Sequence, residues 1–306
     1  MAGLKELRNR LESIKSTQKI TSAMKMVASS RLRKAQIMVE KSEPYSKIIN
    51  TTVKRILASI KEEEKTKNIR YVLPSVLQQK PNAKHYLLFT FASDRGLCGS
   101  YNQNVAKATI SRIKELIGLG KTVKVVCYGK KIYDALKKNY ADLILEHHES
   151  VSANGLFYYE AIDIGKIIGQ CCNDGTCDVC ELVYSHFHSA LSREMVVKQV
   201  YPLEEKYSQV SDEDNELLKA GDAYYDYEPD RLKLLDVLLP KLVVDNIFTG
   251  MVNSQASEQG ARMTAMDNAT KSAKDMIDAL TLKYNSIRQS AITTELNEII
   301  SGAEAL

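Results

Sequence analysis

The stretch from Asp230 to Leu306 constrains the fold more than any other, because it reads as one very long helix. Small or apolar residues recur there at steps of three and four, the spacing of a stripe along one side of a helix. These residues are Ala265, Ala269, Ala273, Met276, Leu280, Tyr284, Ile287 and Ala291. With Pro240 at the first helical position, the helix is expected to reach Ser301 and to be roughly 90 Å long. A helix longer than a domain is wide needs an equally long partner.

The N-terminal segment is the expected partner, because a heptad pattern begins at its fourth residue. The heptad positions are Leu4, Leu7, Leu11, Ile14, Gln18, Thr21, Lys25, Ala28, Leu32, Ala35 and Val39. The ends of this stripe are apolar and its middle is polar, whereas a simple coiled-coil seam stays apolar throughout. Ile20, Met24 and Val27 form a short apolar stripe on a neighbouring face. The apolar face is therefore expected to rotate mid-helix, where the helix meets a second surface.

Proline and charge patterns predict where the two terminal helices end. Pro44 is expected to kink or end the first helix near Glu43, because proline removes a backbone hydrogen bond and clashes with the preceding turn. A helical pattern resumes over residues 45–60, and the charged run at residues 61–68 is expected to be a solvated linker or a frayed end. Asp230 is expected to cap the C-terminal helix, because a carboxylate there accepts bonds from free backbone N–H groups.

The period of the apolar pattern changes between His85 and Leu203. Short apolar runs that suit buried strands alternate there with helical patterns, and the last two runs read as a hairpin turning at residues 190–192. The expected strands cover residues 86–91, 122–128, 143–146, 179–188 and 194–200, and the expected helices cover residues 101–119, 130–138 and 156–172. This alternation predicts an open, Rossmann-like α/β domain with a mostly parallel sheet and an antiparallel edge.

The fold class expected from these patterns is α/β plus long helices. An antiparallel coiled coil of the N- and C-terminal helices carries the α/β domain as an insertion. Residues 1–60 form the N-terminal coiled-coil helix, residues 61–84 a linker, and residues 85–204 the inserted domain. Residues 205–229, which are acidic and aromatic, form a second linker, and residues 230–306 form the C-terminal coiled-coil helix.

Charge is distributed unevenly along the chain. Residues 1–41 contain ten Lys and Arg against three Glu, which gives this segment a charge of +7. The whole chain has a net charge of +4, so the remaining residues together carry −3. A basic helix of this kind suits an acidic partner, nucleic acid or a membrane face. A solvated helix face explains the same charge without any partner.

Few residues point to chemistry. The turn at residues 95–100 (RGLCGS) matches neither the dinucleotide nor the phosphate-loop pattern, although its backbone amides could still bind an anion. No Ser/His/Asp order and no paired carboxylates suggest catalysis. The best metal candidate is the set Cys177, Cys180, His186 and His188. Three of these project from one face of a strand, so only neighbouring pairs could share an ion.

The six cysteines are too few for a disulfide scaffold in a chain of 306 residues. Cys171 or Cys172 could form a redox pair with Cys177, although structural burial explains these side chains more simply. Redox control is therefore a hypothesis. No run of eighteen apolar residues and no signal-peptide core is present in the sequence, which favours a cytosolic location.

The sequence resembles one family closely, the γ subunit of the F-type ATP synthase. The resemblance covers nearly the whole chain and is dense in three places. The first comprises residues 13–28 (SIKSTQKITSAMKMVA) and 33–35 (RKA), the second residues 94–99 (DRGLCG), and the third residues 257–266 (SEQGARMTAM), 292–298 (ITTELNE) and 301–303 (SGA). These strings occur in order at both ends of the chain and around the α/β insertion, which makes the match specific.

The resemblance implies a rotor without catalytic residues, cofactor or metal of its own. In this family the terminal helices form the central shaft inside a ring of alternating α and β subunits, where ATP is made or hydrolysed in β. The inserted domain contacts a small ε-type subunit and the membrane c-ring, so proton flow turns the c-ring and the shaft together. The implied setting is peripheral, on the cytoplasmic face of the bacterial inner membrane, with membrane association only through the complex.

The resemblance also implies which residues contact partners. By matching motif, Met24 and Lys25 lie where the shaft meets acidic loops of β, and Arg262, Gln289 and Thr293 lie on corresponding surfaces of the C-terminal helix. Charge alone adds three exposed cations to this expectation, namely Arg31, Arg33 and Lys34.

Two other functions stay open on the sequence alone. A nucleic-acid-binding coiled coil fits the +7 segment, but residues 1–41 contain no aromatic side chain on which bases could stack. A nucleotide-dependent enzyme built on the α/β domain would need measurable turnover by the isolated chain.

Overall fold

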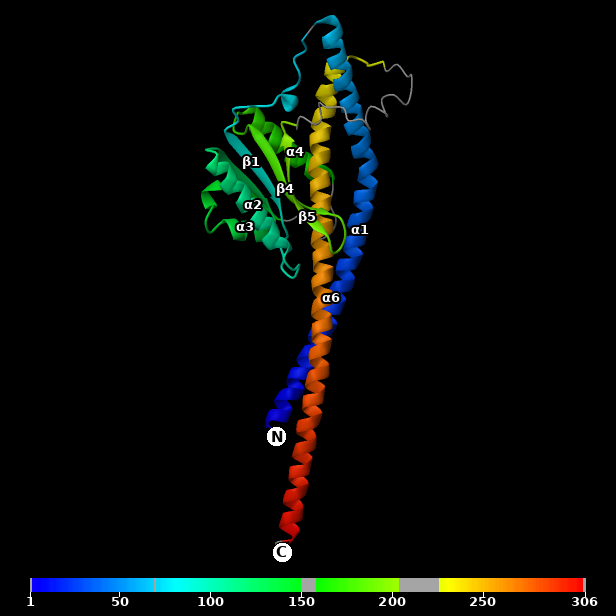
Figure 1. The fold of residues 1–306 in the computed structure, drawn as a ribbon, viewed down its shortest axis with the longest axis vertical. Helices are drawn as coiled ribbons and strands as arrows, with labels where there is room; N and C mark the ends of the chain where they lie inside the picture. The colour runs from blue at the N-terminus through cyan, green and yellow to red at the C-terminus, as the bar shows by residue number, and fades with distance from the viewer. Residues whose placement is uncertain (1, 69, 150–157, 204–225, 305–306) are drawn as a thin grey trace. The chain divides into compact units, whose positions relative to one another are not determined.

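The computed structural model describes residues 2–68, 70–149, 158–203 and 226–304 (Figure 1). The chain divides into two compact units. Unit 1 comprises residues 1–30 and 262–306, and unit 2 comprises residues 31–261. Most of the predicted linker at residues 205–229 lies outside the described residues.

Two long helices come from opposite ends of the chain. α1 runs from Ala2 to Lys67 and α6 from Arg231 to Glu304. Asp230 caps α6 as predicted, because its Oδ1 accepts a hydrogen bond from the Lys233 backbone N–H at 3.0 Å. Pro240 lies inside α6 and not at its first position. The helix therefore begins about two and a half turns before the proline.

The predicted end of the first helix near Pro44 is wrong, because α1 continues through this proline to Lys67. An interior proline destabilises a helix by about 3 kcal/mol. Five apolar side chains on the far side of Pro44 are at most 5% exposed and lie in the core of unit 2: Ile49, Val53, Ile56, Leu57 and Ile60. Since burying one such side chain contributes about 1.5–3 kcal/mol, the five together outweigh the proline.

The charged run that follows is also helical up to Lys67, which corrects the expected linker or frayed end at residues 61–68. Glu63 accounts for much of this order. Its carboxylate pairs with Lys67 one turn later at 2.6 Å and with Arg231 in the first turn of α6. Lys67 and Arg231 lower the pKa of Glu63, Lys67 the more strongly. The end of α1 is thereby tied to the start of α6.

A five-stranded sheet forms the centre of unit 2, as the alternating pattern predicts. Its strands are β1 (His85–Phe91), β2 (Thr122–Tyr128), β3 (Ile144–His148), β4 (Val179–Phe187) and β5 (Arg193–Tyr201). They lie in the order β3-β2-β1-β4-β5, with parallel pairing throughout except for β5, which runs antiparallel to β4 at the edge. The connecting helices are α2 (Tyr101–Gly118), α3 (Lys130–Leu136) and α4 (Tyr158–Asn173).

Each face of the sheet carries its own core. Leu87, Phe89 and Phe91 of β1 pack in the cluster that contains α4 and the described parts of α1 and α6 in unit 2, whereas Leu88 packs with α2 and α3. Alternate residues of a strand point to opposite faces, so β1 serves both cores. Figure 1 shows α2 and α3 on the face of the sheet away from α6.

Candidate functional site

The heptad positions predicted for α1 form the seam of unit 1. Among the described side chains of residues 4–28, those at heptad positions are all half-buried or buried, and Ala28 is only 1% exposed. On α6, Met266 and Ala273 are 4% and 6% exposed. The predicted antiparallel pairing of the two terminal helices is confirmed, because Lys25 pairs with Asp267 and Thr21 with Thr270 further along α6.

The stripe predicted on α6 needs correction at two residues. Ala273, Leu280 and Tyr284 are half-buried or buried as expected, but Met276 is 55% exposed and Ile287 37% exposed. Met266, Thr270 and Ile277 also have reduced exposure, and with Ala273, Leu280 and Tyr284 they recur at steps of four and three, an average spacing close to 3.5 residues. Two paired helices supercoil so that residues spaced about 3.5 apart on average stay on the partner's side. Residues spaced about 3.6 or more apart on average gradually turn away from the partner helix.

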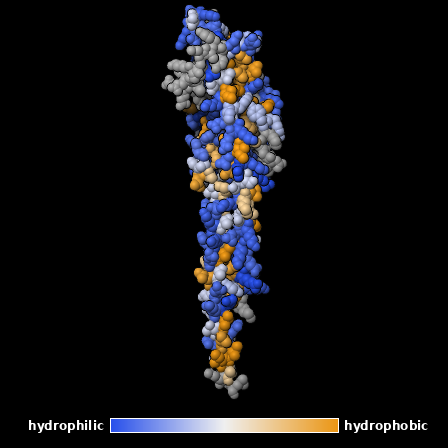
Figure 2. All heavy atoms as spheres, turned by 90° about the vertical axis from the view of Figure 1, so that its right-hand side faces the viewer, coloured by the Kyte–Doolittle hydropathy of each residue, from blue (hydrophilic) through white to orange (hydrophobic). Residues whose placement is uncertain are grey.

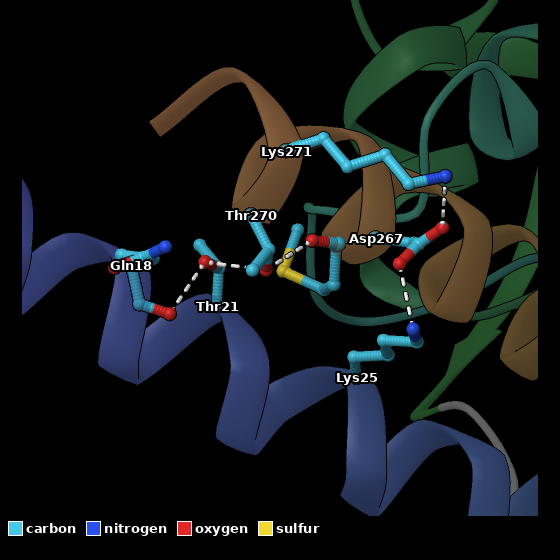
Figure 3. A network of polar contacts seen from close by, with 7 residues as sticks. Gln18, Thr21, Lys25, Asp267, Thr270 and Lys271 are labelled. Atoms are coloured by element: carbon cyan, nitrogen blue, oxygen red, sulfur yellow. Dashed lines mark hydrogen bonds and ion pairs between the residues drawn. The ribbon is translucent and has the colours of Figure 1, made fainter. Parts of the chain in front are cut away.

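A polar layer occupies the middle of the seam (Figure 3). The Lys25 Nζ donates a hydrogen bond to Asp267 Oδ1 at 2.6 Å, and the Lys271 Nζ lies 3.0 Å from Asp267 Oδ2. The hydroxyls of Thr21 and Thr270 are hydrogen bonded at 2.8 Å. The apolar residues move to a neighbouring face at this point, as expected, but the face that packs on α6 stays the same because Thr21 and Lys25 have polar partners there. Such a layer fixes the register of two helices, because any other alignment leaves these groups unpaired.

Asp267 is the centre of this layer, although no sequence pattern singled it out. Lys25 first and Lys271 second lower the pKa of its carboxyl. A carboxyl whose pKa is lower in the folded chain than in the unfolded chain stabilises the fold when it is ionised. This stabilisation is fully present above the pKa of the unfolded chain, about 3.9, and is lost as the pH falls through the pKa of the folded chain. The attraction between α1 and α6 in unit 1 is therefore expected to weaken only in acid.

We predict that Asp267→Asn lowers the melting temperature of the chain slightly at pH 7 and removes part of its decline below pH 4. The effect is small because both partners are substantially exposed, with side-chain exposures of 44% for Lys25 and 29% for Asp267. Thermal unfolding followed by circular dichroism over a pH series measures it. The control is Asp275→Asn, an exposed carboxyl on the same helix. Equal changes in the two variants would contradict the role of the layer.

A second, exposed apolar surface accompanies the seam, as the stripe beside the heptads predicts. Ile20 and Val27 are 57% and 52% exposed, and Met24 between them is half-buried. Hydrophobic side chains this exposed at neighbouring positions of one helix are typical of a surface that meets another protein.

The end of α6 extends past its partner within unit 1. The pairing of Lys25 with Asp267 and Thr21 with Thr270 places the start of α1 beside about residue 290, since paired antiparallel helices advance equally. The last 14 residues of α6, roughly 20 Å, have no α1 residue opposite them. The exposed apolar side chains there are Ile292, Leu296, Ile299 and Ile300, at 48%, 53%, 67% and 54%. Figure 2 shows hydrophobic atoms at the surface near this end.

The predicted partner-contact residues fall in both units. Met24, Lys25, Arg262, Gln289 and Thr293 belong to unit 1, while the exposed Arg31, Arg33 and Lys34 belong to unit 2. Gln289 and Thr293 are exposed one turn apart, and the Thr293 hydroxyl donates to the Gln289 carbonyl at 2.9 Å. Lys25 is the exception to a simple contact surface, because its ammonium already pairs with Asp267.

The carboxyl ends of β1 and β4 are where an open α/β sheet binds a ligand. In this chain α6 covers them. The Ser254 hydroxyl bonds the Phe91 carbonyl at 3.3 Å and the Tyr101 hydroxyl at 2.8 Å, and the Ser257 hydroxyl donates to the Ser185 carbonyl at 3.0 Å. These serines are 4% and 0% exposed. The position that holds a nucleotide in related sheets is filled here by helix side chains.

The proposed metal ligands are not brought together. Cys180 lies near the start of β4 and Cys177 two residues before it, whereas His186 lies near the far end, roughly 20 Å from Cys180, and His188 follows the strand. Among the described residues, no three His, Cys, Asp or Glu side chains are grouped so as to hold a metal ion. Within the same residues, no helix has the length and apolarity to cross a membrane.

Comparisons of the sequence with known protein families and with individual proteins point to the same family. The chain matches the family model described as ATP synthase over residues 3–306. It is 42% identical over 306 residues to the ATP synthase gamma chain of Rhodospirillum rubrum and 40% identical over 307 residues to that of Pelagibacter ubique (strain HTCC1062). Each of these alignments covers 100% of both chains.

Solved structures share the fold. A chain of the central stalk and c-ring structure of the Tetrahymena thermophila mitochondrial ATP synthase has a TM-score of 0.57 at 23% identity, covering 82% of this chain and 99% of that one. A chain of the Euglena gracilis mitochondrial ATP synthase rotor has a TM-score of 0.60 at 16% identity, covering 95% and 99%. The nucleic-acid alternative has no support, since the family match includes the basic segment. The chain belongs to the ATP synthase gamma chain family.

Proposed function

We propose that this chain is the shaft that transmits rotation in a proton-translocating ATP synthase. As a gamma chain it is the central-stalk subunit and carries no catalytic site. Proton flow through a membrane c-ring would turn the shaft, and its unlike faces would drive the β subunits in an α/β ring through different conformations. The inserted domain would contact the c-ring and an ε-type subunit, and contacts of this kind also influence the regulation of ATP hydrolysis.

The observation that carries this proposal is the exposed apolar surface of unit 1. The end of α6 presents Ile292, Leu296 and Ile299 beyond the reach of α1, all at least 48% exposed. Apolar side chains exposed along a helix in this way are typical of a surface that another protein covers. A ring around the shaft would supply that body without fixing it at any one angle.

The contact residues of the shaft are part of the same proposal. Met24, Arg262, Gln289 and Thr293 would meet the ring from unit 1, and Arg31, Arg33 and Lys34 would add positive charge that attracts acidic loops. Lys25 would exchange its bond to Asp267 for a carboxylate of β during part of each turn. Exposed pairs contribute only about 0–1 kcal/mol each, so a rotor can release them in sequence.

Copurification is the direct test of assembly. An affinity tag on the α or β subunit of the native complex should retain this chain in stoichiometric amount. Recovery of the α/β ring without this chain would refute the proposal. The cytoplasmic side of a bacterial inner membrane is the proposed location, and protection of the chain from added protease in right-side-out vesicles would support it.

A reversible cross-link tests the rotation. We predict that Met24→Cys, joined by oxidation to a cysteine in the facing loop of β, stops nearly all ATP hydrolysis by the complex and that reductant restores it. The control is Leu191→Cys, on an exposed turn of unit 2 at 80% exposure, which should not cross-link to the same β cysteine. Full activity in a completely cross-linked Met24→Cys complex would exclude a rotating shaft.

A further inference from the structure

Two thiols lie against each other where α4 passes into β4. Cys172 is in the last turn of α4, and Cys177 lies two residues before β4 begins. Their Sγ atoms are 3.9 Å apart, and both side chains are free thiols. Cys177 is 2% exposed, whereas Cys172 is half-buried. Cys172 is therefore the more accessible residue of the pair.

The backbone holds this pair together without help from the sulfurs. The Cys177 backbone N–H donates to the Cys171 carbonyl at 3.1 Å, and the Gly175 N–H donates to the Cys172 carbonyl at 3.4 Å. Gly175 has a φ of +69°, which lets the chain reverse between the two cysteines. A disulfide needs its sulfurs at about 2.05 Å, so oxidation requires the two Sγ atoms to move closer together.

The charges around the pair favour proton exchange between the two sulfurs. The S–H of Cys172 lowers the pKa of Cys177, and the positive charge of Lys80 lowers it further. The same hydrogen bond raises the pKa of Cys172. Lys80 is held nearby by Asp178, with Nζ 3.2 Å from Oδ1. Cys177 can therefore act as the base for its neighbour, and the thiolate form is the one that reacts with disulfides.

We propose that Cys172 and Cys177 form a dithiol site that low-molecular-weight disulfides of the glutathione type oxidise to an internal disulfide. The step starts with Cys177 as the thiolate, which takes the proton of Cys172. The Cys172 sulfur then attacks one sulfur of the reagent, whose S–S bond breaks to release one thiolate. That thiolate takes the proton from Cys177. The Cys177 thiolate then attacks the Cys172 sulfur and expels the second reagent thiolate, which is protonated by water. Two protein thiols are oxidised and one disulfide is reduced to two thiols.

Asp residues on both sides of Cys177 allow the disulfide to be located by cleaving the chain into peptides. Cleavage before Asp163, Asp174 and Asp178 separates the fragment 163–173 from 174–177 and from the fragment that begins at Asp178. The folded full-length chain is incubated with oxidised glutathione, its remaining thiols are alkylated, and the digest is analysed without reductant. We expect 163–173 and 174–177 to be joined, and reductant to separate them. Fragmentation of the joined peptide in the mass spectrometer assigns its sulfur to Cys172 or Cys171.

Three variants complete the test. Cys171→Ser is the matched control, because Cys171 is the adjacent half-buried thiol, and it should keep the bond. Cys172→Ser should lose the bond. Cys177→Ser should lose it and slowly accumulate glutathione on Cys172, because water must then take the Cys172 proton and the second step has no thiol. A bond through Cys171, or an unmodified wild-type chain under conditions that place glutathione on Cys172 in Cys177→Ser, would overturn the proposal. Circular dichroism verifies that each variant is folded.

Discussion

Replacing Glu181 with Ala is expected to lower the free energy of unfolding of the chain by about 3–5 kcal/mol. Glu181 is 4% exposed on β4, and its carboxylate accepts hydrogen bonds from Arg112 of α2 at 2.8 and 2.6 Å. This contact raises the pKa of Arg112. Without Glu181 the guanidinium stays partly enclosed and loses its main counter-charge. Urea unfolding followed by tyrosine fluorescence measures the change, since the chain has 16 Tyr and no Trp.

Glu115 provides the matched control. It pairs with the same Arg112 at 2.8 Å, but its side chain is 58% exposed against 5% for Glu181. Glu115→Ala is therefore expected to change stability by less than about 1 kcal/mol. Arg112→Leu combined with Glu181→Leu should recover much of the loss, because it removes both charges from the interior. Equal effects of Glu115→Ala and Glu181→Ala would show that burial does not set the strength of this contact.

The α/β insertion could be read from the sequence because its signals are local. The apolar run at residues 86–91 and the DRGLCG turn predict a strand, a turn and a helix, and the structure has β1 and α2 there within one residue. The hairpin of β4 and β5 follows in the same way. The path of α1 past Pro44 could not be read, since the burial of Ile49 to Ile60 that holds it depends on a sheet far away in the sequence.

In the seam between α1 and α6, too, local patterns could be predicted from the sequence and contacts between distant segments could not. The heptads of α1 predicted the seam because one helix alone carries that pattern. Asp267 could not be found as the partner of Lys25, because the pairing depends on the register between two helices that are more than 200 residues apart. The length of α6 that extends past α1 depends on the same register. α1 continues beyond Glu43, so its length is not the reason that α6 extends past it. The register set by Lys25 and Asp267 places the start of α1 before the end of α6 is reached, and the last residues of α6 therefore have no α1 residue opposite them.

The second large effect is expected from Gly129→Ala, which should destabilise the chain by at least about 3 kcal/mol. Gly129 joins β2 to α3 with a φ of +110°, a conformation that other residues rarely adopt. A Cβ added there would lie 2.2 Å from the Ala92 carbonyl oxygen. That oxygen belongs to backbone that follows β1, so relief of the contact requires β1 and β2 to move apart at their carboxyl ends.

Gly120→Ala separates the two causes of this effect. Gly120 also has a positive φ, +71°, but a Cβ there would meet nothing within 4 Å. Its substitution should therefore cost only the backbone strain, about 1–2 kcal/mol. Urea unfolding of both variants gives the difference, which measures the clash with Ala92. If Gly129→Ala and Gly120→Ala unfold alike, the close approach of residue 129 to the end of β1 is not what holds this junction. A much larger loss in Gly129→Ala would show that the close contact with Ala92 is what limits residue 129 to glycine. This contact lies at the carboxyl ends of the strands, where Ser254 and Ser257 of α6 bond to the sheet, so a shift of the strands there would also disturb α6.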